Sequence, residues 1–407
     1  MVHSSVRILV LQESDWVERG PHQSHHLFER LSERGHGIRV VDFEIGWRER
    51  HKPPLLQHRT GFIAPPKIIA RAQVEVVRPA AIHLAYLDYA SILGTHKLEI
   101  RRQFREFRPD ILVGLGLLNA FSGMRQAKRA GVPFVYYLID ELHRLVPQPA
   151  LSGLAQLIEQ ANIRRASLVL SINRALWEYT ISMGASPGRS KVLPAGVDVG
   201  RYAAPRSGSD VRQHNGLSLK DLVLFFMGWV YPFSGLREVA ATLVAGEGQE
   251  ARARLLVVGK GDAWSELTMI VEKAAVTDRI KMVEFQPYSE MPSYLAAADV
   301  CLLPARNVET MRNIVPIKIY EYLAAGKPVI ATRLPGLMKE FGEGHGIVYV
   351  DGPEQVVSKA VELAQKGTLD ELGAAGRMFV AENDWNSITD TFESYLTALV
   401  NRRGPRS

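Results

Sequence analysis

The sequence predicts an α/β protein built from two Rossmann-like domains, with parallel sheets that face each other across a cleft. Short apolar runs alternate with helical segments along most of the 407 residues, a pattern typical of doubly wound sheets. The pattern stops at residues 193–210, which are rich in Pro, Gly and Ser and read as a linker, and then starts again. A chain of this length also exceeds one ordinary core. We therefore expect domains at 1–200 and 201–384, followed by a helix at 385–403.

The first half begins with a strand, a helix and a second strand. The apolar run RILVL predicts a strand over residues 7–11. A helix is expected over 24–34, closed by Gly35 and Gly37, and a strand over 38–43. Apolar runs predict further strands at 111–114, 134–139 and 168–171.

Residues 47–79 do not fit this pattern, because they mix Arg, Lys and His with apolar pairs and several prolines. One interpretation is a long surface excursion with solvated charges. The other is a surface that meets lipid or a long acceptor, with cations toward phosphates and the apolar side chains of Leu55, Leu56, Phe62 and Ile63 dipping in.

The second half carries strands at 222–230, 253–261, 280–286, 300–305 and 328–332. The last of these directly follows a helix that begins near Pro316 and stops at Gly326. Lys318 lies in the first turn of this helix, where a cation is unfavourable by about 0.3–1 kcal/mol. Either this side chain points to water, or an anion binds in front of the helix.

Charge is distributed unevenly along the chain. Residues 1–200 hold 26 Lys and Arg against 18 Asp and Glu, whereas the remainder holds 23 against 25. A basic first half fits nucleic acid, an anionic membrane surface or an acidic acceptor. No apolar run is long enough to span a membrane, the start does not resemble a secretory signal, and Cys301 is the only cysteine. We therefore expect a cytoplasmic protein without disulfides.

A nucleotide site is expected in the second domain. Gly228 and Gly259 end neighbouring strands and should line the same edge as the first turn of the Pro316 helix. Glycine turns and a helix N-terminus bind anions, and Lys318 adds a full charge. Glu321 would instead accept hydrogen bonds from a diol such as ribose. Phosphate together with ribose indicates a nucleotide.

Candidate groups in the first domain follow its strands. Asp140, Glu141 and His143 come directly after an apolar strand, and either serve the cleft or only cap the next helix. His22 and Gln23 follow the turn after the first strand and can offer hydrogen bonds to an acceptor, although His22 could equally be structural. That turn lacks the glycines of an NAD or FAD site, and no convincing metal motif is present.

The motifs LPAGVDVGRY, LLVVGKGD, VEFQPYSEMPSYLAAADVCLLP and PIKIYEYLAAGKPVIATRLPG, in this order and spacing, resemble the family-four glycosyltransferases (glycosyl transferases group 1) of the GT-B fold. The resemblance covers nearly the whole chain. It implies a retaining enzyme that moves a sugar from a nucleotide donor to an acceptor without a bound metal. The acceptor would bind the first domain and the donor the second, and the helix at 385–403 would cross back to the first domain.

The resemblance also implies partners and a location. The subgroup it resembles acts in polysaccharide and cell-surface glycan synthesis. The expected partners are a nucleotide-diphosphate sugar and a glycan or lipid-linked acceptor. The basic first half adds an anionic membrane surface as a further expected partner, and no nucleic acid is expected. The expected location is cytoplasmic, peripheral on the inner face of the membrane.

Residue roles carry over position by position. Glu321 corresponds to the glutamate that holds the ribose, and Gln286 lies where backbone contacts select the base. Asn313 stands where the family often has a second glutamate, and Trp229 and Ser234 stand where it has phosphate-binding Arg and Lys. Lys318 is the best substitute for these cations, and Arg237 or Arg312 could contribute. The expected donor site therefore contains Gly228, Trp229, Gly259, Gln286, Asn313, Lys318 and Glu321.

The reacting sugar should lie beside Asp140 or His143, which take the place of a family histidine. In the front-face mechanism that this family implies, Asp140 orients the acceptor and the leaving phosphate helps to remove its proton. Two other functions remain open. A nucleotide-sugar 2-epimerase shares the fold, and a subunit that only binds nucleotide sugar or acts as a scaffold would explain Trp229, Ser234 and Asn313.

Overall fold

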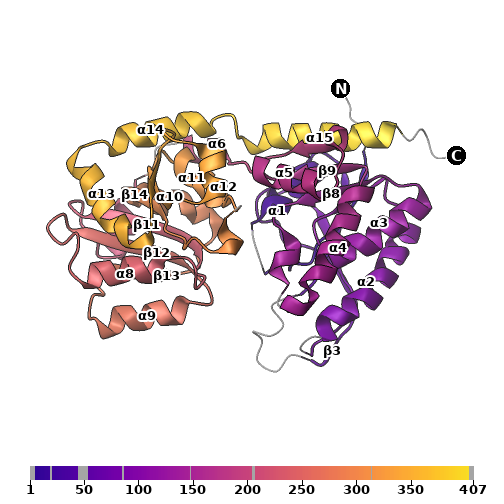
Figure 1. The fold of residues 1–407 in the computed structure, drawn as a ribbon, viewed down its shortest axis with the longest axis horizontal. Helices are drawn as coiled ribbons and strands as arrows, with labels where there is room; N and C mark the ends of the chain where they lie inside the picture. Colours follow the sequence, from indigo (N-terminus) through magenta and orange to yellow (C-terminus); the bar gives the residue numbers. More distant parts are fainter. Residues whose placement is uncertain are drawn as a thin grey trace. The chain divides into compact units, whose positions relative to one another are not determined.

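The computed structural model describes residues 5–18, 21–44, 54–84, 87–146, 148–203, 207–312 and 314–402. The chain divides into two compact units, which are described separately (Figure 1). The first contains Met1–Pro194 and Asn386–Ser407, and the second contains Ala195–Trp385. The expected junction at residue 200 therefore falls within the second unit. Both units have a parallel sheet with helices on its faces, so the predicted α/β class is confirmed.

Within the described residues, the sheet of the first unit has eight strands in the order β10-β9-β8-β7-β1-β2-β5-β4. All neighbours are parallel except β4, which is antiparallel to β5. A short antiparallel pair joins β3 (Leu56–Gln57) to β6 (Ala81–Ile82). The strands of the main sheet are β1 (Arg7–Leu11), β2 (Gly37–Val41), β4 (Thr60–Ile63), β5 (Val74–Arg78), β7 (Ile111–Gly114), β8 (Phe134–Leu138), β9 (Leu168–Ser171) and β10 (Ser190–Val192).

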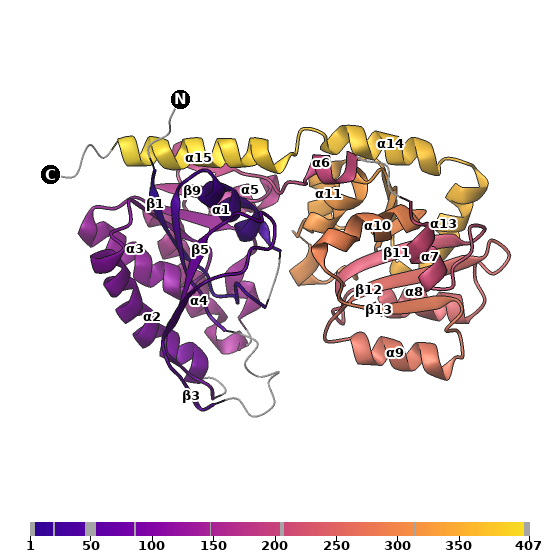
Figure 2. The ribbon, with the colours of Figure 1, turned by 180° about the vertical axis from the view of Figure 1, so that it is seen from behind.

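Helices cover both faces of this sheet. Tyr136 and Tyr137 are successive residues of β8 and therefore point to opposite faces. Tyr136 joins a core cluster with α2 (Leu87–Glu106), α3 (Leu118–Ala130) and α4 (Pro149–Arg165). Tyr137 packs against Phe392 of α15 (Trp385–Asn401), which also contacts Phe28 of α1 (Gln23–Glu33). Helix α5 (Arg174–Ser182) lies beside β9 and β10 (Figure 2).

The interpretation of residues 47–79 as a surface excursion is wrong for its second part. Strand β5 pairs with β2 along its length, and Val74, Val76 and Val77 are buried in the sheet. Arg78 ends this strand and is buried among carboxylates, with hydrogen bonds to Asp15 at 2.9 Å and Asp42 at 2.7 Å. Residues 47–53 lie outside the described part of the chain. Leu55, Leu56 and Ile63 are exposed, which both interpretations allow, whereas Phe62 is half-buried.

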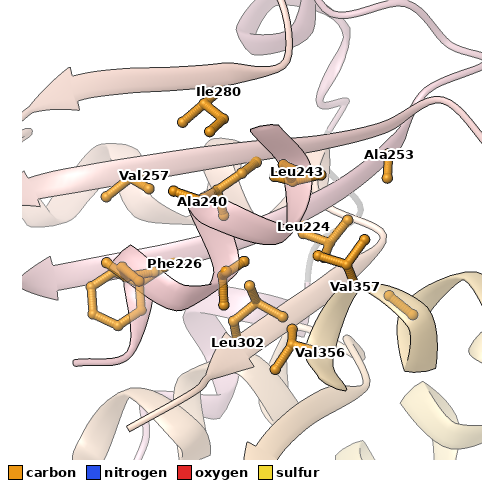
Figure 3. Packing of buried hydrophobic residues seen from close by; sticks show 14 of the residues in the cluster. Leu224, Phe226, Ala240, Leu243, Ala253, Val257, Ile280, Leu302, Val356 and Val357 are labelled. Carbon is orange, nitrogen blue, oxygen red and sulfur yellow. The ribbon is translucent and has the colours of Figure 1, made fainter. Parts of the chain in front are cut away.

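In the second unit, the described residues form a six-stranded parallel sheet in the order β13-β12-β11-β14-β15-β16. One face packs against α8 (Leu236–Val244), α9 (Trp264–Lys273) and α13 (Val356–Gln365) through a dense apolar cluster that includes Leu224, Phe226 and Val257 (Figure 3). The other face carries α11 (Ile317–Ala324), whose Tyr322 ring contacts Phe225 edge-on. The strands are β11 (Leu222–Trp229), β12 (Ala253–Lys260), β13 (Ile280–Glu284), β14 (Val300–Leu303), β15 (Val329–Thr332) and β16 (Ile347–Val350).

The expected linker at 193–210 is more ordered than its composition suggests. Val197 is fully buried and forms an isolated parallel bridge with Asp384. Helices α6 (Val199–Ala203) and α7 (Ser209–His214) follow, and α6 packs on α11. Helix α15 carries the chain into the first unit, as its contacts with Phe28 and Tyr137 show. No helix in the described part of the chain is long and apolar enough to cross a bilayer.

Candidate active site

Two glycines lie at the carboxyl edge of the second sheet. Gly228 of β11 lies opposite Gly259 of β12 in the strand register. A Cβ on Gly259 would lie 1.9 Å from the Gly228 carbonyl oxygen, so only glycine fits there. Gly228 has φ of 117°, and a Cβ at this position would lie 2.9 Å from Nζ of Lys318. Gly228, Gly259 and Lys318 thus lie close together in the structure, although they are far apart in sequence.

Lys318 lies in the first turn of α11, beside the end of β11. Its Nζ is 4.1 Å from the centroid of the Phe226 ring, a cation–π geometry. Burial lowers the pKa of Lys318 to about 8, partly offset by the negative charge of Glu321. The structure shows a cation held in a partly desolvated position at a glycine-lined edge.

Glu321 follows Lys318 by one turn and is only 7% exposed. The Tyr202 hydroxyl donates to its Oε1 at 3.4 Å, and Tyr288 is a second hydrogen-bond donor. Burial raises the pKa of this carboxyl, although the hydrogen bonds from Tyr288 and Tyr202 oppose the shift. The Arg201 guanidinium lies 4.4 Å from the centroid of the Tyr288 ring. Glu321 is therefore a fixed acceptor close to Lys318.

Trp229 and Gln286, two further residues of the predicted donor site, have hydrogen-bond partners of their own. Trp229 donates from Nε1 to Asp262 at 3.0 Å, and Nζ of Lys260 lies 5.5 Å from the Trp229 ring centroid. Gln286 is partly exposed, and its amide nitrogen donates to the Glu284 carbonyl at 3.1 Å. Asn313 lies outside the described residues.

The cations considered as additional phosphate ligands have different surroundings. Arg237 lies in the first turn of α8 and donates to Glu266 of α9 at 3.0 Å, so its charge is already compensated. Arg312 is exposed. Lys260, in the motif GKGD, had no predicted role, yet it ends the strand next to Gly259. Together with Lys318 it supplies positive charge along this edge.

In the first unit, Asp140 and His143 follow β8 as expected. Burial raises the pKa of Asp140 to about 6, and the negative charge of Glu141 adds to the shift. The next residues form a short 3₁₀ turn, Leu142–Leu145. Asp140 is therefore a carboxyl group that titrates close to neutrality at the carboxyl edge of the first sheet.

His143 is held by a buried network. Its Nδ1 lies 2.7 Å from Oε2 of Glu159, a residue of α4 that is fully buried. The Tyr179 hydroxyl donates to the same oxygen at 2.6 Å, and the Leu142 amide donates to the other at 3.0 Å. Glu159 thus ties the segment after β8 to α4 and α5. The network fixes the orientation of the His143 ring.

The two acceptor candidates differ in accessibility. His22 is exposed at the start of α1, where its backbone N–H donates to Nδ1 of His25 at 3.1 Å. Gln23 is 1% exposed, and its amide nitrogen donates to the Tyr137 hydroxyl and to the Pro194 carbonyl. Gln23 is held inside the first unit, whereas His22 can reach a ligand.

Three residues of these networks had no predicted role, namely Tyr202, Tyr288 and Glu159. Tyr202 ends the motif GVDVGRY and Tyr288 lies in QPY, so both tyrosines stand in motifs that were already of interest. Glu159 lies mid-helix without a motif, and only the fold reveals its contact. Among the described residues, no three His, Cys, Asp or Glu side chains are grouped so that they could hold a metal ion. Metal independence stays a prediction.

Comparisons with known proteins add two family matches and several similar structures. Residues 222–366 match the family model "Glycosyl transferases group 1", and residues 19–196 match "Glycosyl transferase 4-like domain". A D-inositol 3-phosphate glycosyltransferase of Segniliparus rotundus is 27% identical over 264 residues, which cover 62% of this chain and 57% of that relative.

Two solved structures resemble the whole chain. Sucrose-phosphate synthase from Thermosynechococcus elongatus has a TM-score of 0.74 at 17% identity, covering 98% of this chain and 100% of that one. Anabaena Alr3699/HepE in complex with UDP-glucose has a TM-score of 0.70 at 17% identity, covering 97% and 100% of the two chains. At this identity the likeness establishes the fold.

Proposed function

The chain belongs to the GT-B glycosyltransferases of the glycosyl transferases group 1 type, and from this premise we propose that it transfers a sugar, with retention of configuration, from a nucleoside-diphosphate sugar to a glycan or lipid-linked acceptor. The arrangement of Lys318 and Glu321 beside the paired glycines is the observation that carries this proposal. A cation and an anion one helical turn apart suit a ligand with a phosphate and a diol, as a nucleotide has.

The donor would lie along the carboxyl edge of the second sheet. Gly228 and Gly259 leave room for the diphosphate to approach the backbone, and Lys318 compensates its charge. Glu321, oriented by Tyr202 and Tyr288, would accept hydrogen bonds from the ribose hydroxyls. The complex of Alr3699/HepE with UDP-glucose supports a uracil nucleotide as the first donor to try.

The reaction would follow a front-face course. The bond between the anomeric carbon and the leaving phosphate oxygen breaks, while the acceptor oxygen bonds to the same face of that carbon. The acceptor proton passes to the leaving phosphate. Lys318 stabilises the charge that develops on the diphosphate, since a fixed cation acts most strongly where charge grows. Asp140, when ionised, would orient the acceptor hydroxyl on the first unit, and His143 follows it three residues along the chain.

Hydrolysis of the donor tests the proposal without knowledge of the acceptor. We expect the full chain to release nucleoside diphosphate slowly from one of UDP-, GDP-, ADP- or dTDP-sugars, with the free sugar first appearing in the donor's anomeric configuration by NMR. EDTA should leave this rate unchanged. Loss of activity with EDTA, restored by Mg²⁺ or Mn²⁺, would contradict metal independence, and inversion would contradict the front-face course.

A subunit that binds nucleotide sugar without transferring it is the second candidate. This function is favoured by Trp229, which stands where the family has a phosphate-binding cation. Its indole N–H donates to Asp262. Such a protein would bind donor and release no sugar. A 2-epimerase would convert the donor without releasing nucleoside diphosphate, so the same assay separates all three functions.

A further inference from the structure

Helices α2, α3 and α4 form a continuous layer on one face of the first sheet. Helix α3 packs against both of the others, and all three supply residues to one core cluster (Figures 1 and 2). Their opposite sides face solvent. We call the exposed residues of these three helices the outer face of the layer.

The outer face is strongly basic. Where the structure describes side-chain exposure on these helices, eight Lys and Arg are exposed against a single acid, Glu106, which pairs with Arg102. The cations of α2 recur every four residues, which places them on one side of the helix. Six of the eight exposed cations lie on α2 and α3, and none of these six forms an ion pair with a described residue. The eight are Lys97, Arg101 and Arg105 on α2, Arg125, Lys128 and Arg129 on α3, and Arg164 and Arg165 on α4.

The same face exposes large apolar side chains. On α4, Leu151, Leu154 and Leu157 are 49%, 58% and 64% exposed and follow one another at three-residue spacing. On α2, Leu93 and Leu98 are 52% and 64% exposed. Leucines at this spacing usually face a core, and several exposed together on one layer of helices are typical of a surface that meets an apolar partner.

We propose that the outer face of the α2–α3–α4 layer docks on the surface of an anionic lipid bilayer. Cations recognise the phosphate headgroups, and the leucines enter the boundary between headgroups and acyl chains. Nucleic acid would use the cations but would leave the leucines in water. The proposal differs from a contact through residues 47–79, because β5 of that segment belongs to the sheet.

Co-sedimentation of the full chain with lipid vesicles tests this surface. The parent should bind vesicles of phosphatidylcholine mixed with phosphatidylglycerol, bind pure phosphatidylcholine much less, and lose binding as salt screens the charges. The α3 triple variant Arg125→Gln, Lys128→Gln, Arg129→Gln should bind about 100-fold more weakly, since each surface cation contributes about 1 kcal/mol near an anionic leaflet.

A matched variant separates location from net charge. Lys191→Gln, Lys220→Gln, Lys273→Gln removes three exposed cations outside the layer and should bind like the parent. A second pair tests the leucines. Leu154→Ser, Leu157→Ser should weaken binding about tenfold through lost apolar burial, whereas Leu219→Ser, Met269→Ser, at exposed positions of the second unit, should not.

The proposal does not rest on the proposed function, because none of these residues belongs to the donor site. Donor hydrolysis and the thermal unfolding temperature should match the parent in all four variants. Equal binding to neutral and anionic vesicles would overturn the proposal, as would equal loss in the α3 variant and its control. Loss of DNA-duplex binding or of self-association in the α3 variant, with vesicle binding retained, would assign the face to that other partner and overturn it too.

Discussion

Burial moves the pKa values of Lys318 and Asp140 toward neutral pH, in opposite directions. Burial lowers the pKa of Lys318 to about 8 and raises that of Asp140 to about 6. Lys318 is a cation below its pKa, and Asp140 is an anion above its own. Both groups therefore carry the charge assigned to them only between these two values.

The pH dependence of kcat/KM should follow these two groups, because this ratio reports the ionisation of the free enzyme. We expect a bell, with activity rising through about pH 6 as Asp140 ionises and falling above about pH 8 as Lys318 loses its proton. Asp140→Asn should remove the acid limb, and Lys318→Met the alkaline limb. A parental profile without either limb would exclude both residues from the reaction.

Single residues could be predicted where a motif and a strand end coincide. Gly228, Gly259, Lys318 and Glu321 follow from that logic, because the carboxyl ends of parallel strands share one edge. Tyr202 could not be predicted as a partner of Glu321, because the two are 119 residues apart and nothing local couples them. Glu159 is closer in sequence to its partner His143, but it lies in the middle of α4 and belongs to no motif, so its contact could not be predicted either.

At the scale of elements, continuous apolar runs predicted the central strands. Strand β5 was missed because Glu75 and Arg78 interrupt its valines, and the ion pairs that compensate Arg78 come from Asp15 and Asp42, distant in sequence. The short edge strands β10 and β16 carry too few residues for a clear period. Periodicity reports burial on a face, and it fails where buried charges replace apolar groups.

Helix α15 is the element whose docking can be tested most simply. Phe392 is fully buried against Phe28 and Tyr137, so Phe392→Ala should lower the free energy of unfolding of the first unit by about 3–5 kcal/mol. Urea titration followed by circular dichroism would measure this loss. Ser394→Ala, at an exposed position of the same helix, is the control. Equal midpoints for both variants would show that α15 contributes nothing to the first unit.

Acidification should reduce the stability that Glu393 of α15 contributes to the first unit. Burial alone would raise the pKa of Glu393, but hydrogen bonds from Arg34 and His36 hold it below its ordinary value of 4.5. A carboxyl with a lowered pKa stabilises the fold above its ordinary pKa, and this contribution disappears as the pH falls through the folded-state pKa. Glu393→Gln should therefore reduce stability at neutral pH and should lose this difference in acid. A difference that persists in acid would mean that packing, not charge, holds Glu393.

For the whole molecule, the two units divide the chemistry. The residues of the proposed nucleotide site, Lys318 and Glu321 with Gly228 and Gly259, all lie in the second unit, whereas the excess of positive charge and the exposed leucines of the α2–α3–α4 layer lie in the first. This division matches a transferase that holds a small soluble donor on one unit and meets a large acceptor with the other. The uneven distribution of charge could be predicted by comparing residues 1–200 with the rest of the chain, because net charge can be counted from the sequence without knowledge of the fold.

The most direct measurement compares turnover with donor affinity in Lys318→Met, which keeps the apolar stem and removes the charge. If Lys318 stabilises the departing diphosphate, turnover should fall about 10²–10³-fold, while the dissociation constant of the donor rises by less. Thermal stability should equal or slightly exceed that of the parent, because a cation leaves the first turn of α11. Donor turnover by Lys318→Met at the parental rate would contradict the assignment of this edge as the site of sugar transfer.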